Sequence, residues 1–160
     1  MSEIQHKKMP QPNPIGYGNY RDEYGTPDQI WQPLRPFDID VAASQTSRIG
    51  VKNWTKEDDG LSKPWDGFWF CNPPFSKKAE FLQKAYDFPN GIMLLPMSTD
   101  TKWFQEMVSK SGHVFFFGTR IHYIGASGPA IFQSGLIPFG DEAVRRIQAA
   151  KLRGIMMKTS

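Results

Sequence analysis

Short apolar runs alternate with amphipathic stretches along most of this 160-residue chain. Continuous apolar runs, which are typical of strands buried on both faces, occur at 67–71, 92–95 and 114–117. Residues 37–43 alternate apolar and acidic side chains and predict a shorter strand. Amphipathic helices are predicted between these runs, at 76–88 and 100–111.

The segment after the third apolar run predicts two more strands, at 120–124 and 130–132, joined by a glycine-rich loop. Residues 136–139 continue the second of these strands, whereas Gly and Pro break residues 44–66 into a loop. Strands that alternate with helices predict an α/β domain with a mostly parallel sheet, closed here by an antiparallel hairpin. Ligands bind such sheets at the carboxyl ends of the strands.

The two ends of the chain depart from this pattern. The polar N-terminal segment holds several Pro and Gly residues and shows no hydrophobic period. Thr26 and Pro27 suit a helix start, with Thr as the cap and Pro at the first helical position. The C-terminal segment predicts a helix from Asp141 to about Arg153. We therefore expect a flexible arm over 1–25, a core over 26–140 and a basic C-terminal helix over 141–160.

Composition narrows the class of protein. A content of 39% hydrophobic and 14% aromatic residues excludes a disordered chain, and the length matches one domain. The single cysteine, Cys71, excludes an intramolecular disulfide framework and a cysteine-rich zinc site. His113 and His122 are isolated, and no spacing of His, Asp and Glu indicates a metal site. We expect no membrane span and no signal peptide, hence a cytoplasmic protein.

The formal net charge of +3 is too small to predict nucleic-acid binding by itself. Its surplus lies in the C-terminal segment, where a basic helix could contact phosphates. Arg146 and Arg153 there, and Arg120 just beyond a predicted strand end, are candidate DNA contacts. A solvated helix face, or an ion-paired surface arginine, is the alternative interpretation.

The sequence Asn72-Pro73-Pro74-Phe75 follows directly from an apolar run, and this placement makes it informative. Two consecutive prolines fix φ near −65° and remove two backbone donors, so the turn presents mainly carbonyl oxygens. The amide of Asn72 adds another acceptor, and Phe75 supplies a flat apolar ring. Acceptors beside a ring suit an exocyclic amino group on a planar heterocycle.

These four residues resemble the catalytic motif, Asp, Asn or Ser followed by Pro-Pro and then Tyr or Phe, of DNA amino-methyltransferases. Those enzymes methylate N6 of adenine or N4 of cytosine with S-adenosylmethionine. The segments 24–27, 37–44, 58–61, 70–76 and 94–96 are, in this order, similar to bacteriophage-type DNA N6-adenine methyltransferases (Dam-like). The resemblance spans roughly Tyr24 to Gly140 and implies a compact Rossmann-like methyltransferase fold.

The resemblance implies that the target adenine of double-stranded DNA is turned out of the duplex to meet the methyl donor. The side-chain oxygen of Asn72 and the carbonyl of Pro73 would accept hydrogen bonds from its amino group, with Pro74 completing the rigid turn. Phe75 would stack on the base. No covalent nucleophile is needed, and Cys71 is expected to be buried.

The resemblance also implies where S-adenosylmethionine binds. Thr26 and Pro27 would contact its methionine end, and Asp40, with Ala42 after it, would accept its ribose hydroxyls. Asp59 would accept from its adenine amino group, and Leu61 would lie against that ring. Alternation places Asp38 on the same face as Asp40, so the sequence does not separate the two.

The glycine-rich cofactor loop of most such enzymes is missing, and its nearest equivalent is residues 40–44. Either Ala and Ser replace the glycines, or this strand corresponds to the second strand of the usual fold. A non-catalytic DNA- or protein-binding module is therefore a second hypothesis, and cytosine-N4 methylation is the alternative within the class. Sequence recognition is expected from loops such as 44–58 and 119–130, from the arm or from a partner. The sequence leaves a homo-oligomer open.

Overall fold

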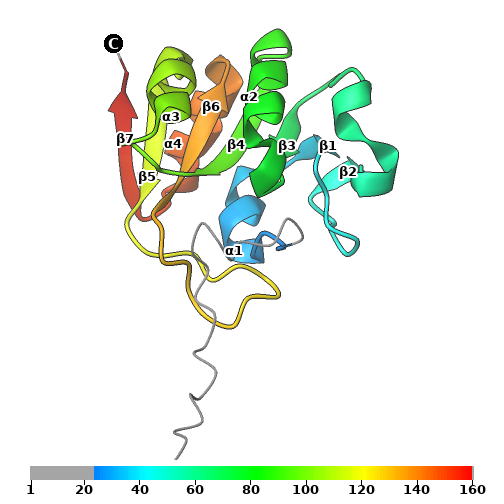
Figure 1. The fold of residues 1–160 in the computed structure, drawn as a ribbon, viewed down its shortest axis with the longest axis horizontal. Coiled ribbons are helices and arrows are strands. Elements are labelled where there is room, and N and C mark those ends of the chain that lie inside the picture. The colour runs from blue at the N-terminus through cyan, green and yellow to red at the C-terminus, as the bar shows by residue number, and fades with distance from the viewer. Residues whose placement is uncertain (1–23, 160) are drawn as a thin grey trace, which may run out of the picture.

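The computed structural model describes residues 24–159, so all but the last two residues of the predicted arm lie outside the described residues. Its centre is a seven-stranded sheet in the order β2-β1-β3-β4-β6-β5-β7 (Figure 1). The strands are β1 (Phe37–Asp40), β2 (Gly50–Asn53), β3 (Trp69–Cys71), β4 (Gly91–Pro96), β5 (His113–Phe117), β6 (Ser134–Phe139) and β7 (Gly154–Lys158). The α-helices are α1 (Asp28–Trp31), α2 (Lys78–Asp87), α3 (Lys102–Met107) and α4 (Asp141–Ala150).

The sheet divides into a parallel and an antiparallel half. The pairs β2-β1, β1-β3 and β3-β4 are parallel. The pairs β4-β6, β6-β5 and β5-β7 are antiparallel. The α/β class is thus confirmed, although the sheet is less parallel than the sequence pattern predicts.

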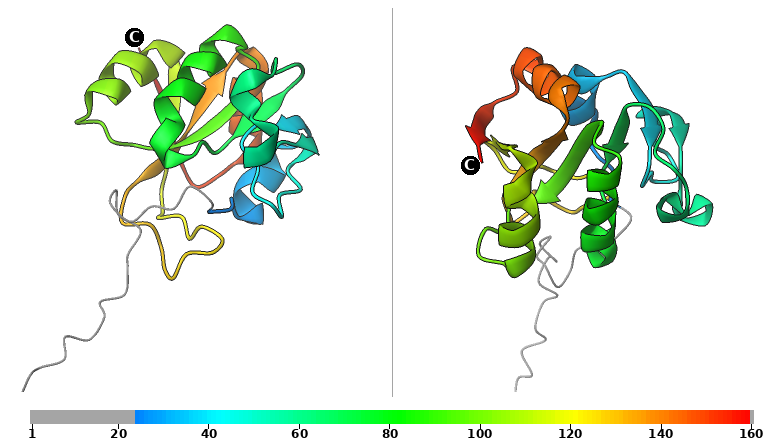
Figure 2. Two further views of the ribbon diagram at one scale, coloured as in Figure 1. Left: turned by 45° about the vertical axis from the view of Figure 1, so that its right-hand side comes forward. Right: turned by 90° about the horizontal axis from the view of Figure 1, so that it is seen from above.

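Helices cover both faces of the sheet (Figure 2). Helices α1 and α4 lie on one face, over a core cluster that includes Leu34, Phe70 and Leu136. Helices α2 and α3 lie on the other, over a cluster that includes Trp69 and Leu82. Neighbouring residues of one strand therefore enter different cores, which explains why the strands read as continuous apolar runs.

The predicted hairpin at 120–124 and 130–132 is wrong. Residues 118–133 form a long connection that extends below the sheet next to α1 (Figure 1), and a β-bridge joins its Ile124 to Gly25. The antiparallel strand is instead β6, which lies between β4 and β5. The connection has apolar residues like those of a strand, but Ile121 and Tyr123 are buried against the core, and no strand of the described residues includes them. The backbone N–H of Ala130 donates to the Ile121 carbonyl over 2.9 Å, so the two predicted arms approach each other without forming strands.

Two strands lie where the sequence predicts a loop and a helix. Strand β2 pairs with β1 although its Val51 is 85% exposed, so backbone pairing and not burial holds it. The predicted C-terminal helix is wrong beyond Ala150, because Lys151 adopts a left-handed conformation with φ of 50° and ends α4. Strand β7 follows at the sheet edge.

Candidate functional site

The parallel half contains one point at which the direction of strand addition reverses. The chain leaves β1 toward β2 on one side, and it leaves β3 toward β4 on the other. Strands β1 and β3 are neighbours, with Asp40 beside Phe70 in the register. The carboxyl ends of two such strands form the crevice in which open α/β sheets bind ligands. Asp40 and the motif that begins at Asn72 both lie at this point.

Asn72 is half-buried just past the end of β3, and a hydrogen bond fixes its amide group. Its Nδ2 atom donates to Oγ1 of Thr26 over 3.1 Å. Because the amide nitrogen is directed at Thr26, Oδ1 is the atom that Asn72 can offer to a donor on a ligand. Thr26, predicted to contact the cofactor, thereby also orients the predicted catalytic side chain.

The two prolines hold the rest of the motif rigid. Pro73 is buried, and the carbonyl of Pro74 accepts the backbone N–H of Lys77 over 2.9 Å in a single turn of 3-10 helix. Phe75 begins that turn and is half-buried. Helix α2 starts at Lys78, two residues later than the predicted start at Ser76.

Asp40 is a buried carboxylate, 2% exposed, at the end of β1. Its Oδ2 accepts from Oγ of Ser47 over 2.7 Å, and its Oδ1 accepts from the backbone N–H of Ala42 over 3.3 Å. Burial raises the pKa of Asp40 to about 6, and these two hydrogen bonds offset only part of that effect. A buried carboxylate with a strongly raised pKa at a ligand crevice is a candidate functional group.

Asp38 differs from Asp40 in its exposure and in the strand end at which it bonds. It is exposed, and its Oδ2 accepts the backbone N–H of Phe68 over 2.7 Å, just before β3 begins. Gly67 lies against the Asp38 side chain with φ of +94°. Asp38 thus ties β1 to the amino end of β3, and Asp40 is the acid at the carboxyl end.

Asp59 and Leu61 lie in a tight loop that packs on the end of β1. A Cβ on Gly60 would lie 2.1 Å from the carbonyl oxygen of Val41, so only glycine allows this approach. The exposed Asp59 has φ of 52°, and Leu61 packs on the α2-side core. Lys84 of α2 donates to the Leu61 carbonyl over 2.5 Å.

A cavity of about 430 Å³ opens beside Thr26, the residue that bonds to Asn72. It lies between the segment that enters α1 and the connection from β1 to β2, and its lining includes Thr26, Pro27, Ser44 and Ser47. Ser47 also bonds to Asp40, so the cavity and the buried carboxylate share a wall. The predicted cofactor residues Thr26, Pro27 and Asp40 are therefore brought together.

Cys71 is buried at the end of β3, as expected. Burial, together with the nearby charge of Asp40, raises the pKa of its thiol well above its usual range. The thiol is therefore protonated at neutral pH and is no nucleophile.

The three predicted DNA contacts lie in different settings. Arg146 is held inside the protein: it donates to the carbonyls of Leu34 and Pro36, and its guanidinium lies 3.8 Å from the ring centre of Phe68. Arg120 and Arg153 are exposed and flank the end of β5, on the same edge of the sheet as the motif. All three roles stay predictions, and the geometry favours Arg120 and Arg153.

The described part of the chain, residues 24–159, contains no cluster of His, Cys, Asp and Glu able to hold a metal ion. Within the same residues, no helix has the length and apolar character that crossing a membrane requires.

Sequence reasoning missed Ser47, Lys78, Lys84 and Trp103, which surround the predicted residues. Ser47 lies in a segment that reads as a plain loop, and the others come from helices whose apolar pattern says nothing of their polar groups. Only contacts between segments distant in sequence identify them.

Comparison with known proteins agrees with this geometry. A family model described as DNA N-6-adenine-methyltransferase (Dam) matches residues 17–136. The chain belongs to the Dam family. The match confirms the resemblance that the motifs indicate.

One curated relative in the Dam family is the DNA N-6-adenine-methyltransferase of Escherichia phage T1. It is 29% identical over 106 residues, which are 60% of this chain and 44% of that protein. The match therefore spans less than half the length of the relative. No solved structure matches the chain.

Proposed function

We propose that the protein is an adenine-specific DNA methyltransferase, which transfers a methyl group from S-adenosylmethionine to N6 of an adenine turned out of double-stranded DNA. One observation carries the proposal: Asn72 lies at the reversal point between β1 and β3 with its amide nitrogen held by Thr26. Its oxygen is thus committed to accepting from a ligand. The family match, to residues 17–136, supports the same function.

The proposed chemistry rests on two acceptors. Oδ1 of Asn72 and the carbonyl oxygen of Pro73 accept the two N–H groups of the adenine amino group. Hydrogen bonds from both hydrogens withdraw the nitrogen lone pair from the ring and direct it at the methyl donor. As the new N–C bond forms, the S–CH3 bond would break to leave a neutral thioether, and one N6 proton would be released to solvent. Since the rigid turn fixes both acceptors before the base arrives, catalysis relies on positioning and on oriented dipoles.

S-adenosylmethionine fits the residues beside this turn. The buried Asp40 can accept ribose hydroxyls, the cavity at Thr26 and Pro27 can take the methionine end, and Asp59 with Leu61 can hold the adenine. When bound, the cofactor supplies an electrophilic methyl group on its sulfonium. Burying the charge of Asp40 lowers the stability of the fold, and hydrogen bonds donated by a bound ligand would offset part of that penalty.

Phe75 is proposed to stack on the target base, and the protonated Cys71 takes no part. We propose that Arg120 and Arg153 contact DNA phosphates from the end of β5. The long connection over residues 118–133 extends from that same edge of the sheet (Figure 1) and is a candidate for contact with the duplex. A Rossmann-like methyltransferase fold accounts for the ligand crevice at the β1-β3 reversal.

A degenerate binding module remains the second candidate. The connection from β1 to β2 contains no glycine between Asp40 and Gly50, so a ligand cannot approach its backbone as it approaches a glycine-rich loop. Small side chains, Ala42, Ala43 and Ser44, stand there instead.

The test is to incubate the protein with S-adenosylmethionine and unmodified duplex DNA, digest the DNA to nucleosides and analyse them by mass spectrometry. We expect N6-methyl-2′-deoxyadenosine. Detection of N4-methyl-2′-deoxycytidine instead would show that the target base is cytosine. DNA binding without methylation, together with no calorimetric signal for S-adenosylmethionine, would support the binding module.

A further inference from the structure

Lys78 brings a charged group to the motif without belonging to it. Its Nζ atom lies over the ring of Phe75, 3.9 Å from the centroid, and 5.2 Å from the centroid of the Trp103 ring. Nζ also lies 3.4 Å from the carbonyl oxygen of Phe75 and donates to it. One ammonium thus contacts the connection after β3 and the helix after β4.

The surroundings of Lys78 differ from those of its neighbour. Lys78 is half-buried, and this partial burial lowers the pKa of its ammonium. Lys77, one residue earlier, has an exposed side chain. An ammonium withdrawn from water over aromatic rings interacts more strongly with them than an exposed one does. The contact with Phe75 is therefore a fixed part of the site.

We propose that Lys78 is a positioning residue for methyl transfer: its ammonium, held over Phe75 and close to Trp103, fixes the ring of Phe75 in the orientation that stacks on the target base. The inference rests on the proposed function, because it gives Phe75 a base to stack on.

The effect of Lys78 follows from the rigidity of its neighbours. The two prolines before Phe75 set its backbone, whereas the orientation of its ring about χ1 and χ2 depends on side-chain contacts. The cation–π contact and the bond to the Phe75 carbonyl oppose that rotation. If the Phe75 ring changes orientation, the stacked base moves relative to the acceptors on Asn72 and Pro73. Small displacements of that kind lower the rate of the chemical step.

The experiment compares Lys78→Met, Lys78→Arg and Lys77→Met with wild type on duplex DNA and S-adenosylmethionine. Lys78→Met and Lys77→Met remove the same charge one residue apart, so they separate the aromatic contact from general attraction to DNA. We expect Lys78→Met to lower kcat about 3- to 30-fold with little change in KM for DNA, the range that loss of a cation–π contact implies. Lys78→Arg keeps a cation over the ring and should restore kcat to within about threefold of wild type.

A double-mutant cycle with Phe75→Leu identifies the partner. The effect of Lys78→Met on kcat should shrink to less than about twofold in the Phe75→Leu background, because the ring it positions is gone. If Lys78→Met matches Lys77→Met, or raises KM alone with a weaker salt dependence, Lys78 contacts phosphate and the inference is wrong. If the wild-type protein methylates no DNA, the proposed function itself fails.

Discussion

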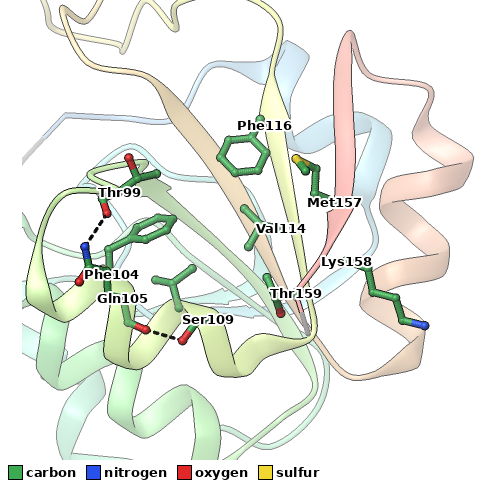
Figure 3. A pocket seen from close by; sticks show the side chains of 10 residues that line it. Thr99, Phe104, Gln105, Ser109, Val114, Phe116, Met157, Lys158 and Thr159 are labelled. Atoms are coloured by element: carbon green, nitrogen blue, oxygen red, sulfur yellow. Dashed lines mark hydrogen bonds between the residues drawn. The ribbon is translucent and has the colours of Figure 1, made fainter.

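The parallel and antiparallel halves of the sheet each combine buried inner strands with an exposed edge strand, yet they differ in chemistry. Where β1 and β3 end side by side, Asp40 closes β1 and bonds to Ser47, and Asn72 follows β3 and donates to Thr26. The antiparallel half instead encloses an apolar cavity of about 350 Å³ between α3, β5 and β7, around which Val114 and Met157 gather (Figure 3). Its polar groups include Gln105, which is bonded to the Thr99 carbonyl and to Ser109.

Strand direction explains the difference. Parallel neighbours end at the same edge, so polar residues that follow them in sequence gather at one place. Antiparallel neighbours end at opposite edges, so equivalent residues are dispersed. The parallel half therefore gathers the proposed catalytic and cofactor residues from segments distant in sequence. The antiparallel half contributes packing and the proposed DNA contacts at the end of β5.

The largest expected effect is on the parallel side. Asn72→Ala removes one of the two proposed acceptors and should lower kcat about 10²- to 10³-fold, as losing one oriented polar group does in other enzymes. Because Asn72 is half-buried and the variant loses the side-chain bond to Thr26, the melting temperature should change by only a few degrees.

The matched control is Asn90→Ala. Asn90 is exposed, donates to the Gly67 carbonyl and lies before β4, at the opposite edge of the sheet. Methylation rates measured with radiolabelled S-adenosylmethionine should match wild type in this variant. Equal losses in both variants would mean that the two edges do not differ in function.

In the antiparallel half, a core substitution is expected to lower stability and leave catalytic activity largely unchanged. Leu136 of β6 is fully buried, so Leu136→Ala should lower the free energy of unfolding by about 2 to 5 kcal/mol. Its kcat, measured well below the melting temperature, should stay close to that of wild type. Met157→Ala on the exposed face of β7 is the control, with a change within about 0.5 kcal/mol in urea unfolding. A large loss of kcat in folded Leu136→Ala protein would show that this half also serves catalysis.

The third prediction concerns Asp40, whose pKa burial raises to about 6. The folded protein holds this proton more tightly than the unfolded chain, so the free energy of unfolding falls as the pH rises from about 4 to about 6. The shift of roughly 2 pKa units corresponds to about 3 kcal/mol. Asp40→Asn should remove this part of the pH dependence and be at least as stable as wild type at pH 7.

The same variant should bind S-adenosylmethionine at least about tenfold more weakly, because charged hydrogen bonds to the ligand are lost. In wild type, cofactor affinity should decrease below pH 6, where Asp40 takes up its proton. Asp38→Asn is the control, and calorimetric titration should find its affinity unchanged. If only Asp38→Asn lost affinity, Asp38 and not Asp40 would be the acid that binds the cofactor.

The sequence predicts the place of the Asn72–Phe75 motif better than it predicts the sheet. Asn72 to Phe75 follow a buried strand, and that placement is readable from hydrophobicity alone. Strand β2 is not, because its exposed Val51 leaves no apolar pattern and the backbone pairing with β1 defines it. Residues 120–132 show the opposite case: their apolar pattern predicts two strands, but the buried residues pack on the core from an irregular connection.

Within the site, sequence pattern cannot distinguish Asp38 from Asp40, because both lie on the same side of one strand. Their burial differs only because Ser47 and the segment after β1 cover Asp40. Arg146 illustrates the same limit: its sequence suggests a solvated or DNA-facing group, whereas its guanidinium stacks on Phe68. Tertiary contacts, which no local pattern contains, decide such cases.

The most direct test of the central claim is backbone hydrogen exchange, followed by mass spectrometry, with and without S-adenosylmethionine. If the reversal point between β1 and β3 is the cofactor site, exchange should slow in residues 40–47 and 58–61 and stay unchanged in β5 and β7. Slowed exchange confined to α3, β5 and β7, around the apolar cavity, would contradict the account.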